Sequence, residues 1–199
     1  MTENRILRSI AVVFALATPV AAQDAGPFGL TWLVSTSDVE ALGVSLAPLA
    51  GSDYGKAFTA SGLPKALSDM ETAILSFGYN DQLWRIVAFG KENDNDGYGS
   101  LAKARYADLA TSLEKSYNVT GTYTRPALDS FYAKPENFAY ALSKNEAFWY
   151  STYTSPVADI ELSIDAVGVN DTYWRLIYSH RAGEQTFLTA KGNAEADAL

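Results

Sequence analysis

A ten-residue pattern occurs twice in this chain and constrains its fold more than any other feature. Residues 78–87 read GYNDQLWRIV, and residues 168–177 read GVNDTYWRLI. Both copies begin with glycine, any residue, asparagine and aspartate, which favour the backbone conformations of tight turns. Both continue with aromatic and β-branched residues, which are typical of strands. The repetition predicts two β-hairpins that belong to a duplicated structural unit.

The first copy allows its strand register to be tested. If residues 80–81 form the tip of the hairpin, Leu75 lies opposite Ile86 and Phe77 lies opposite Trp84. These pairs share one face of the hairpin and are all apolar, as expected for a face that packs on a core. Trp84 is therefore a predicted core residue.

The second copy does not tolerate the same short turn. A two-residue tip would place Leu176 opposite Asp165, an apolar residue against a charged one, so a longer loop is predicted there. In both copies the arginine after the tryptophan, Arg85 or Arg175, falls on the face opposite the tryptophan. These two arginines are predicted to be solvated strand residues, and they are candidate binding residues.

Helical patterns lie between the predicted strands. Capping and breaking residues predict a short helix at 35–43, the strongest helical pattern covers 98–117, and a third helix is predicted at 135–143. Aligned on the repeat, each half reads as a helix followed by three strands. The prediction is an α+β fold with an antiparallel sheet built from two such repeats. Its parts are one domain at 23–185, pseudo-repeats at about 27–97 and 119–181, a linking helix at 98–117 and a flexible tail at 186–199.

The long helix has a stripe of large residues at four-residue steps. Leu101, Leu109, Leu113 and Tyr117 lie on it, together with Arg105, whose aliphatic stem can cover apolar surface. We expect this stripe to be buried.

The first 22 residues resemble a secretory signal. Arg5 and Arg8 precede an apolar stretch at 10–17, and small residues at 20–22 form a cleavage site after Ala22. The apolar stretch is far shorter than the roughly 20 residues that cross a bilayer. The expected product is periplasmic or secreted and has no membrane span.

Composition excludes several classes of function. The chain has no cysteine, which removes thiol catalysis and zinc–thiolate sites. Its formal net charge is −8, and removal of Arg5, Arg8 and Glu3 with the signal leaves −9. Because a chain with this negative charge repels phosphate backbones, no nucleic-acid partner is predicted.

A search for catalytic and metal sites gives no complete motif. The single histidine, His180, is predicted at a strand end near the surface, and no G-x-S-x-G motif accompanies it. The acidic stretch 92–97 resembles half of a calcium loop, but Lys103 stands where a bidentate glutamate is required. We interpret the stretch as a solvated loop. The sequence therefore predicts no catalytic residue, no metal site and no cofactor.

Aromatic residues are concentrated between 131 and 150. Strand alternation places Trp149 on the face opposite Phe148 and Tyr150. An aromatic cluster of this kind can pack in a core or line a binding groove. Trp149 is the third candidate binding residue.

The stretch Gly26-Pro-Phe-Gly-Leu-Thr-Trp32, followed by a short capped helix that ends at residues 41–43, resembles a family of exported proteobacterial proteins with no assigned activity. The segment 63–69 before a strand and Tyr98-Gly99 at the start of a long helix fit the layout of that family. The resemblance implies an exported α+β protein. The helix-plus-hairpin repeat is also similar to the tandem architecture of β-lactamase-inhibitor-like proteins and small outer-membrane assembly factors.

These observations favour a non-enzymatic periplasmic domain that binds another periplasmic or envelope protein through its sheet. One alternative is an inhibitor of an exported enzyme such as a lysozyme or a β-lactamase, because an acidic surface suits a basic target. A second alternative is a hydrolase with an unrecognised carboxylate site, since 23 acidic residues offer many possible pairs.

Overall fold

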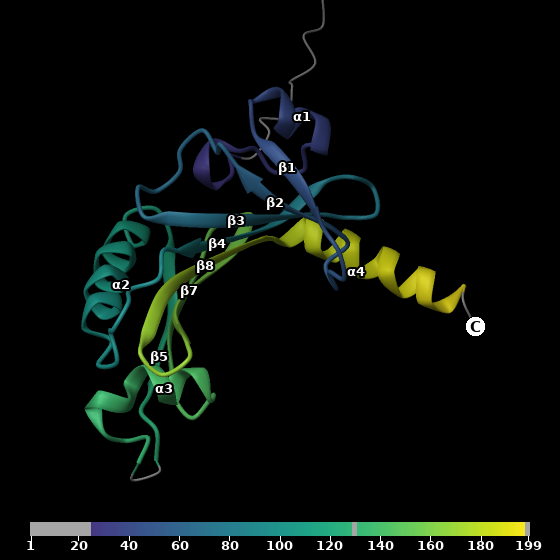
Figure 1. Cartoon of the computed structure of the whole chain (residues 1–199). Helices are drawn as coiled ribbons and strands as arrows, with labels where there is room; N and C mark the ends of the chain where they lie inside the picture. Colours follow the sequence, from purple (N-terminus) through teal and green to yellow (C-terminus); the bar gives the residue numbers. More distant parts are fainter. Residues whose placement is uncertain (1–24, 129–130, 198–199) are drawn as a thin grey trace, which may run out of the picture.

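The computed structural model of the chain describes residues 25–128 and 131–197. The predicted signal peptide at 1–22 lies outside these residues. Eight antiparallel strands form one sheet in the order β1-β2-β3-β4-β8-β7-β6-β5, with helices packed against it (Figure 1). The predicted α+β class and the antiparallel sheet are confirmed.

The strands are β1 (Ser45–Leu49), β2 (Lys56–Ser61), β3 (Met70–Phe77), β4 (Leu83–Gly90), β5 (Asn118–Arg125), β6 (Phe148–Thr154), β7 (Ala158–Val167) and β8 (Asp171–His180). The α-helices are α1 (Thr36–Ala41), α2 (Ser100–Leu113), α3 (Phe138–Ser143) and α4 (Arg181–Ala196). Two short 3₁₀ turns, η1 (Pro27–Gly29) and η2 (Pro135–Asn137), complete the fold. The first three α-helices lie within the predicted helical segments.

Local chemistry explains where α1 begins and ends. The Ser35 hydroxyl accepts a hydrogen bond from the backbone N–H of Asp38, and the Asp38 carboxylate accepts one from the backbone N–H of Ser35. This reciprocal pair satisfies donors that a helix start otherwise leaves unpaired. Gly43, with a φ of 85°, follows the end of the helix in a conformation that costs glycine little.

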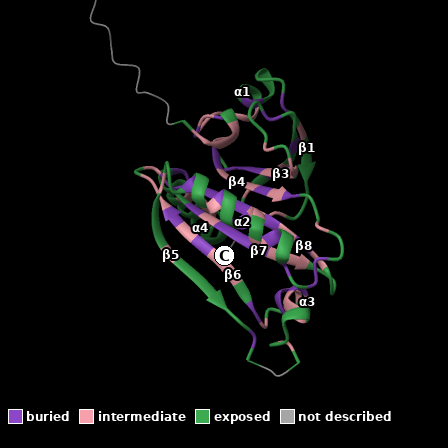
Figure 2. Ribbon diagram, turned by 90° about the vertical axis from the view of Figure 1, so that its left-hand side faces the viewer, coloured by how far each residue is buried: buried purple, intermediate pink, exposed green. Residues whose placement is uncertain are grey.

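The sheet consists of two four-stranded meanders. Strands β1 to β4 follow one another in space, β5 to β8 do the same, and the two sets join where β4 pairs with β8. The outermost strands, β1 and β5, are the two that the sequence does not predict. Each of these strands has one half-buried residue, and all its other residues are exposed, as Figure 2 shows for β5. Strands exposed on both faces lack the apolar alternation that identifies a half-buried strand.

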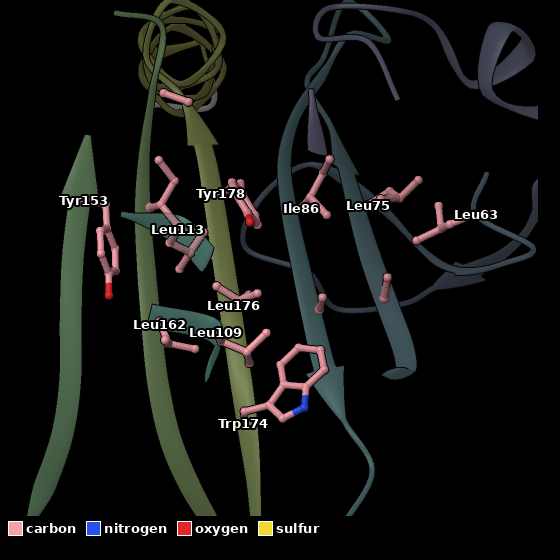
Figure 3. Close-up of a cluster of buried hydrophobic side chains, with 14 of the residues drawn as sticks. Leu63, Leu75, Ile86, Leu109, Leu113, Tyr153, Leu162, Trp174, Leu176 and Tyr178 are labelled. Atoms are coloured by element: carbon pink, nitrogen blue, oxygen red, sulfur yellow. The ribbon is translucent and has the colours of Figure 1, made fainter. Parts of the chain in front are cut away.

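Helix α2 covers one face of the sheet and forms the main core with it. Leu109 and Leu113 of α2 lie over Leu162 and Leu176 of the central strands (Figure 3). The predicted stripe is wrong in part, because the Leu101 side chain is 58% exposed. Four residues advance an α-helix by more than one turn, so a strict four-residue stripe drifts around the surface. The buried residues instead follow the helical period: Ala102, Tyr106, Leu109 and Leu113.

Helix α4 lies on the other side of the sheet from α2 (Figure 1). Gly183 and Phe187 are its buried residues, and the Phe187 ring stacks on Trp84 with 4.9 Å between ring centroids. The segment 186–199, predicted as a flexible tail, is instead helical as far as Ala196. Alanine, glutamate, glutamine and lysine favour helix and outweigh the two glycines, while Phe187 anchors the helix.

The first repeated hairpin follows the predicted register at its base and departs from it at the tip. Leu75 pairs with Ile86 as predicted, but Phe77 pairs with Leu83 across a β-bulge. The predicted pairing of Phe77 with Trp84 is therefore wrong. The bulge turns Trp84 to the side of α4, and Trp84 is 2% exposed there.

The second hairpin has the longer loop that its sequence predicts. Val167 pairs with Asp171, so three residues form the connection, and Leu176 lies opposite Leu162. Trp174 is buried in the α2 core, where its indole Nε1 donates to Asp69 Oδ2 at 2.9 Å. The tryptophans of the two repeated patterns therefore pack on opposite sides of the sheet.

Gly90, the last residue of β4, allows Trp174 to lie close to the backbone. A Cβ atom at this position would overlap the Trp174 indole. We expect Gly90→Ala to lower the free energy of unfolding by about 1–3 kcal/mol, as overpacked core substitutions do. Urea denaturation measures the change.

Gly192 in α4 is the matched control, because an added Cβ there meets no atom within 4 Å. Gly192→Ala is expected to stabilise the chain slightly, by up to about 1 kcal/mol. An unchanged urea midpoint for Gly90→Ala would contradict the close packing of Trp174 on β4.

Candidate functional site

The sheet face opposite α2 carries the two candidate arginines. Paired residues in adjacent strands point to the same side, and the β4–β8–β7 ladder aligns Val87 with Ile177 and Glu161. We call this surface the open face. We define it by Arg85, Val87, Phe89, Tyr150, Glu161, Ser163, Asp165, Tyr173, Arg175 and Ile177.

Helices cover little of the open face. Helix α4 contacts β4 and β8 and reaches the end of the face near Arg85, whereas the helices that contact β7 are α2 and α3, on the other side. Most residues of the open face are half-buried, including Val87, Phe89 and Ile177. The face therefore presents apolar side chains next to charged ones.

Arg175 holds two carboxylates of β7. Its Nη2 lies 3.5 Å from Glu161 Oε1, and its Nε lies 3.0 Å from Asp165 Oδ2. Burial raises the pKa of Asp165, and the charge of Arg175 and a hydrogen bond from Ser163 oppose that rise. At the edge of the same face, Asp159 pairs with Arg181 at 3.0 Å. These three carboxylates are thus each engaged by an arginine.

Arg85 lies over an aromatic ring at the other end of the open face. Its guanidinium carbon is 4.3 Å from the centroid of the Tyr54 ring, and its Nη1 donates to Ser179 Oγ at 3.2 Å. Burial lowers the pKa of Arg85, and nearby charges including Glu184 partly oppose this.

The expectation that Arg85 and Arg175 are solvated strand residues is wrong, because both are half-buried. The cause is the pairing of β4 with β8, which surrounds each arginine with neighbouring strands.

Both arginines retain unused hydrogen-bond donors. The Nε atoms of Arg85 and Arg175 are buried and have no hydrogen-bond partner among the described residues. For Arg175 the carboxylate of Asp165 is close enough for an ion pair, but the N–H is not directed at it. A buried donor without a partner costs about 1–3 kcal/mol, so the fold bears this cost at both arginines.

Three hollows extend along the open face. One of about 370 Å³ lies between Arg85 and Glu161, and a second of about 240 Å³ lies between Glu161 and Arg175. The third, of about 590 Å³, is lined by Phe89 and Tyr173. The first two hollows share Glu161, so they form a continuous uneven surface rather than one deep cleft.

Trp149 lines the second hollow together with Arg175, but its ring packs on the α2 side of the sheet. Its ring makes edge contacts with Tyr106 of α2 and Phe138 of α3, at centroid distances of 6.4 and 5.8 Å. The predicted alternation is confirmed, because Phe148 and Tyr150 contact each other at 5.5 Å on the opposite face. The structure thus groups two of the three candidate binding residues on one face and places the third on the other.

His180 ends β8 as predicted, but it is not at the surface. The residue is 3% exposed, and its ring lies 5.5 Å from that of Trp32. Its Nδ1 accepts a hydrogen bond from the backbone N–H of Gly183, so the side chain caps α4. The start of α4, whose position the sequence does not predict, explains this burial.

The acidic stretch 92–97 is not simply a solvated loop. The Asp96 carboxylate is 5% exposed and accepts hydrogen bonds from the backbone N–H groups of Leu101 and Ala102 and from the hydroxyl of Thr172. It therefore caps α2 and attaches the loop to β8. Across residues 25–128 and 131–197, no group of three His, Asp or Glu side chains lies close enough to hold a metal ion.

Sequence reasoning missed the acidic side of the open face. Residues 158–165 read ADIELSID, in which polar residues alternate with apolar ones from Asp159 to Asp165. This period of two indicates a half-buried strand with a polar face and could have identified Glu161. No local signal predicts that Tyr54 meets Arg85.

No helix among the described residues is long and apolar enough to cross a membrane. Comparisons of the chain with protein-family models, with curated proteins and with solved structures find no match. The function proposed below therefore rests on the residues and geometry of this chain.

Proposed function

We propose that this chain is an exported, non-enzymatic binding domain and that its open face binds another periplasmic or envelope protein. The observation that carries the proposal is the combination, on one sheet face, of half-exposed apolar residues with two half-buried arginines. The signal-like residues 1–22 and the resemblance of residues 26–32 to exported proteobacterial proteins support the proposed location.

The composition of the open face fits a protein partner. Aromatic residues and arginine are enriched at protein interfaces, and lysine is depleted. The residues that define the open face include Phe89, Tyr150 and Tyr173 beside Arg85 and Arg175, and a lysine, Lys91, enters only at the lining of the third hollow. Its shallow hollows suit side chains of a partner better than a fully enclosed small molecule.

The carboxylates of the open face support binding over hydrolysis. A general acid or base requires a carboxyl group that can exchange a proton with a substrate. Glu161 and Asp165 both pair with Arg175, and Asp159 pairs with Arg181. In this arrangement the three carboxylates hold the side chains of Arg175 and Arg181 in position.

We further propose that the sheet arose by duplication of a four-stranded unit. Two features support this. Strands β1–β4 and β5–β8 are both meanders, and each meander ends in a hairpin that carries the repeated ten-residue pattern. The join between β4 and β8 then creates the open face, to which each unit contributes one arginine.

Affinity capture from a periplasmic extract of the native host tests the binding function. Arg175→Glu and Ile177→Asp change the open face, and Val169→Asp is the control because Val169 lies in the β7–β8 loop and is 54% exposed. We expect the wild-type protein and the control to recover the same partner. The two open-face variants should recover it at least about tenfold less efficiently, as for the loss of an interface hot spot.

Circular dichroism spectra confirm that each variant is folded before the comparison. Equal recovery by Ile177→Asp would show that the partner binds elsewhere and would reject the open face. Recovery of no specific protein by the wild type would reject the proposed function.

A further inference from the structure

The largest of the three hollows, of about 590 Å³, lies at the end of the open face where β4 and β7 end. We call it the Tyr173 hollow. We define it by Glu71, Phe89, Lys91, Glu92 and Tyr173, all of which line it. Its volume falls within the range of sites that take a ligand.

Two aromatic rings form a wall of the Tyr173 hollow. The ring centroids of Phe89 and Tyr173 are 6.2 Å apart, and the ring planes meet at 49°. Both residues are half-buried. The face of an aromatic ring attracts a cation. Every lysine or arginine that lies over a ring in the described part of the chain lies over a different one, so these two rings hold no cation of the chain itself.

An irregularity in β3 brings a carboxylate next to Phe89. The register of β3 against β4 shifts between Met70 and Thr72, and Thr72 is the residue that pairs with Phe89. Glu71 is therefore an additional residue beside that pair. An additional residue of this kind redirects a side chain, and such bulges are frequent near functional sites.

A second irregularity brings two charged residues next to Tyr173. Residues 90–92 lie between the residue that pairs with Arg175 and the residue that bridges to Thr172, whereas β8 has only residues 173–174 in the same interval. The chain after β4 therefore also has one additional residue, and Lys91 and Glu92 lie in this bulge. Two bulges thus meet at one hollow.

The charges around the hollow favour a cation. Glu71 and Glu92 are exposed, and neither they nor Lys91 form an ion pair with a described residue. Two carboxylates and one ammonium group sum to a formal charge of −1. Burial raises the pKa of the Tyr173 phenol, and nearby carboxylates that include Glu92 add to this rise. Glu92 therefore acts directly on the aromatic wall.

Arg175, the next cation along the open face, does not reverse this balance. It lies 3.5 Å from Glu161 and 3.0 Å from Asp165, so two carboxylates compensate its charge. The whole chain has a formal net charge of −8, which favours the approach of a basic partner.

We propose that the Tyr173 hollow binds the guanidinium group of an arginine side chain that the partner protein presents to the open face. A guanidinium stacks on aromatic faces and pairs with carboxylates through a planar set of donors, so it suits this hollow better than an ammonium does. Phe89 and Tyr173 supply the rings, and Glu71 and Glu92 supply the carboxylates. The inference rests on the function proposed above and adds the chemistry of the partner.

Titration of the full chain with N-acetyl-arginine methylamide tests the hollow without the partner. The readout is the set of backbone amide signals of residues 89–92 and 173 in a ¹H–¹⁵N correlation spectrum. We expect a saturable shift with a Kd on the order of 10 mM, as for one side chain at a partly exposed site. The citrulline analogue has nearly the same shape and no charge, and it should bind at least about threefold more weakly.

Substitutions around the hollow should have opposite effects. Glu92→Gln and Phe89→Leu should each weaken binding of the arginine compound by about two- to fivefold. Lys91→Met removes a competing positive charge and should strengthen binding by about two- to fivefold. Glu40→Gln is the matched control for Glu92→Gln, because Glu40 is exposed on α1 and does not line the hollow. It should bind the compound as the wild type does.

The capture experiment links the hollow to the partner. Glu92→Arg places a like charge where the partner's arginine is expected, so it should recover the partner at least about tenfold less efficiently. Glu40→Arg makes the same charge change on α1 and should recover it fully. Equal recovery by Glu92→Arg would show that no arginine of the partner enters the hollow.

Three results of the titration would also overturn the proposal. Equal binding of the citrulline analogue would show that charge plays no part, and weaker binding to Lys91→Met would show that the hollow does not select a cation. Absence of any saturable shift with the arginine compound would reject the site itself. The titration needs no partner, so its failure is distinguishable from failure of the proposed protein-binding function.

Discussion

Replacement of Trp174 by alanine is expected to lower the free energy of unfolding by about 3–5 kcal/mol, which is typical for loss of a buried large aromatic side chain. Trp174 is 2% exposed, lies in the core between β8 and α2, and leaves a large void when truncated. Equilibrium unfolding in guanidinium chloride, followed by circular dichroism, measures the loss.

A hydrogen-bonded junction adds to the packing of Trp174. The Asp69 carboxylate accepts from Trp174 Nε1 at 2.9 Å and from Arg105 Nε and Nη2 at 2.7 and 2.6 Å. This one side chain therefore joins β8, α2 and the segment that precedes β3. Burial raises the Asp69 pKa, but the hydrogen bonds from Arg105 and Trp174 outweigh burial and lower it overall.

Trp174→Phe separates the two contributions. It keeps most of the ring volume and removes the indole donor, so we expect a smaller loss of about 1–2 kcal/mol. If Trp174→Phe were as damaging as Trp174→Ala, the hydrogen bond to Asp69 rather than the filled volume would control stability. An alanine variant as stable as the wild type would contradict the described core.

Phe187→Ala is expected to release α4 from the sheet. Gly183 and Phe187 are the buried residues of this helix, and the Phe187 ring stacks on Trp84 and on Tyr79, at centroid distances of 4.9 and 5.7 Å. Loss of a buried phenylalanine removes about 3–5 kcal/mol, enough to open an element with so few buried contacts. We expect amides of α4 to exchange rapidly with deuterium in this variant, while amides of β7 and β8 stay protected.

The adjacent Leu188 provides the control. Its side chain is 52% exposed, so Leu188→Ala should change the free energy of unfolding by less than about 0.5 kcal/mol and leave α4 protected. Rapid exchange in β7 and β8 of the Phe187 variant would show that α4 is an integral part of the main core. Unchanged protection of α4 would show that Phe187 does not anchor it.

The hairpins were predictable because their signals are local. The turn residues and alternating strands are contiguous, and the pairing of Leu75 with Ile86 and the longer second loop both follow from them. The bulge at Trp84 was not predictable, because its packing partner Phe187 lies about a hundred residues further along the chain. Gly183 and Gly192 obscured the helical pattern near the end of the chain. The packing of Phe187 on Trp84 holds this segment in place as a helix.

The sequence identified two residues of the candidate site but did not predict their surroundings in the fold. Arg85 and Arg175 were selected because they follow the repeated tryptophans, yet their burial depends on the pairing of β4 with β8. The hydrogen bond from Arg85 to Ser179 connects residues 94 positions apart. Nothing local to either segment encodes that pairing, since many antiparallel strands could lie beside β4.

The two outer strands of the sheet differ in how they can associate. Strand β1 is five residues long and contains Pro48, which has no backbone N–H to donate, whereas β5 has eight residues, no proline, and Arg125 as its one charged side chain. Prolines and charges on an edge oppose the addition of another strand, and β5 has few of either. Two copies that met along β5 would each present only the β1 edge outward. Association along the sheet would therefore stop at a pair and would not extend into a fibre.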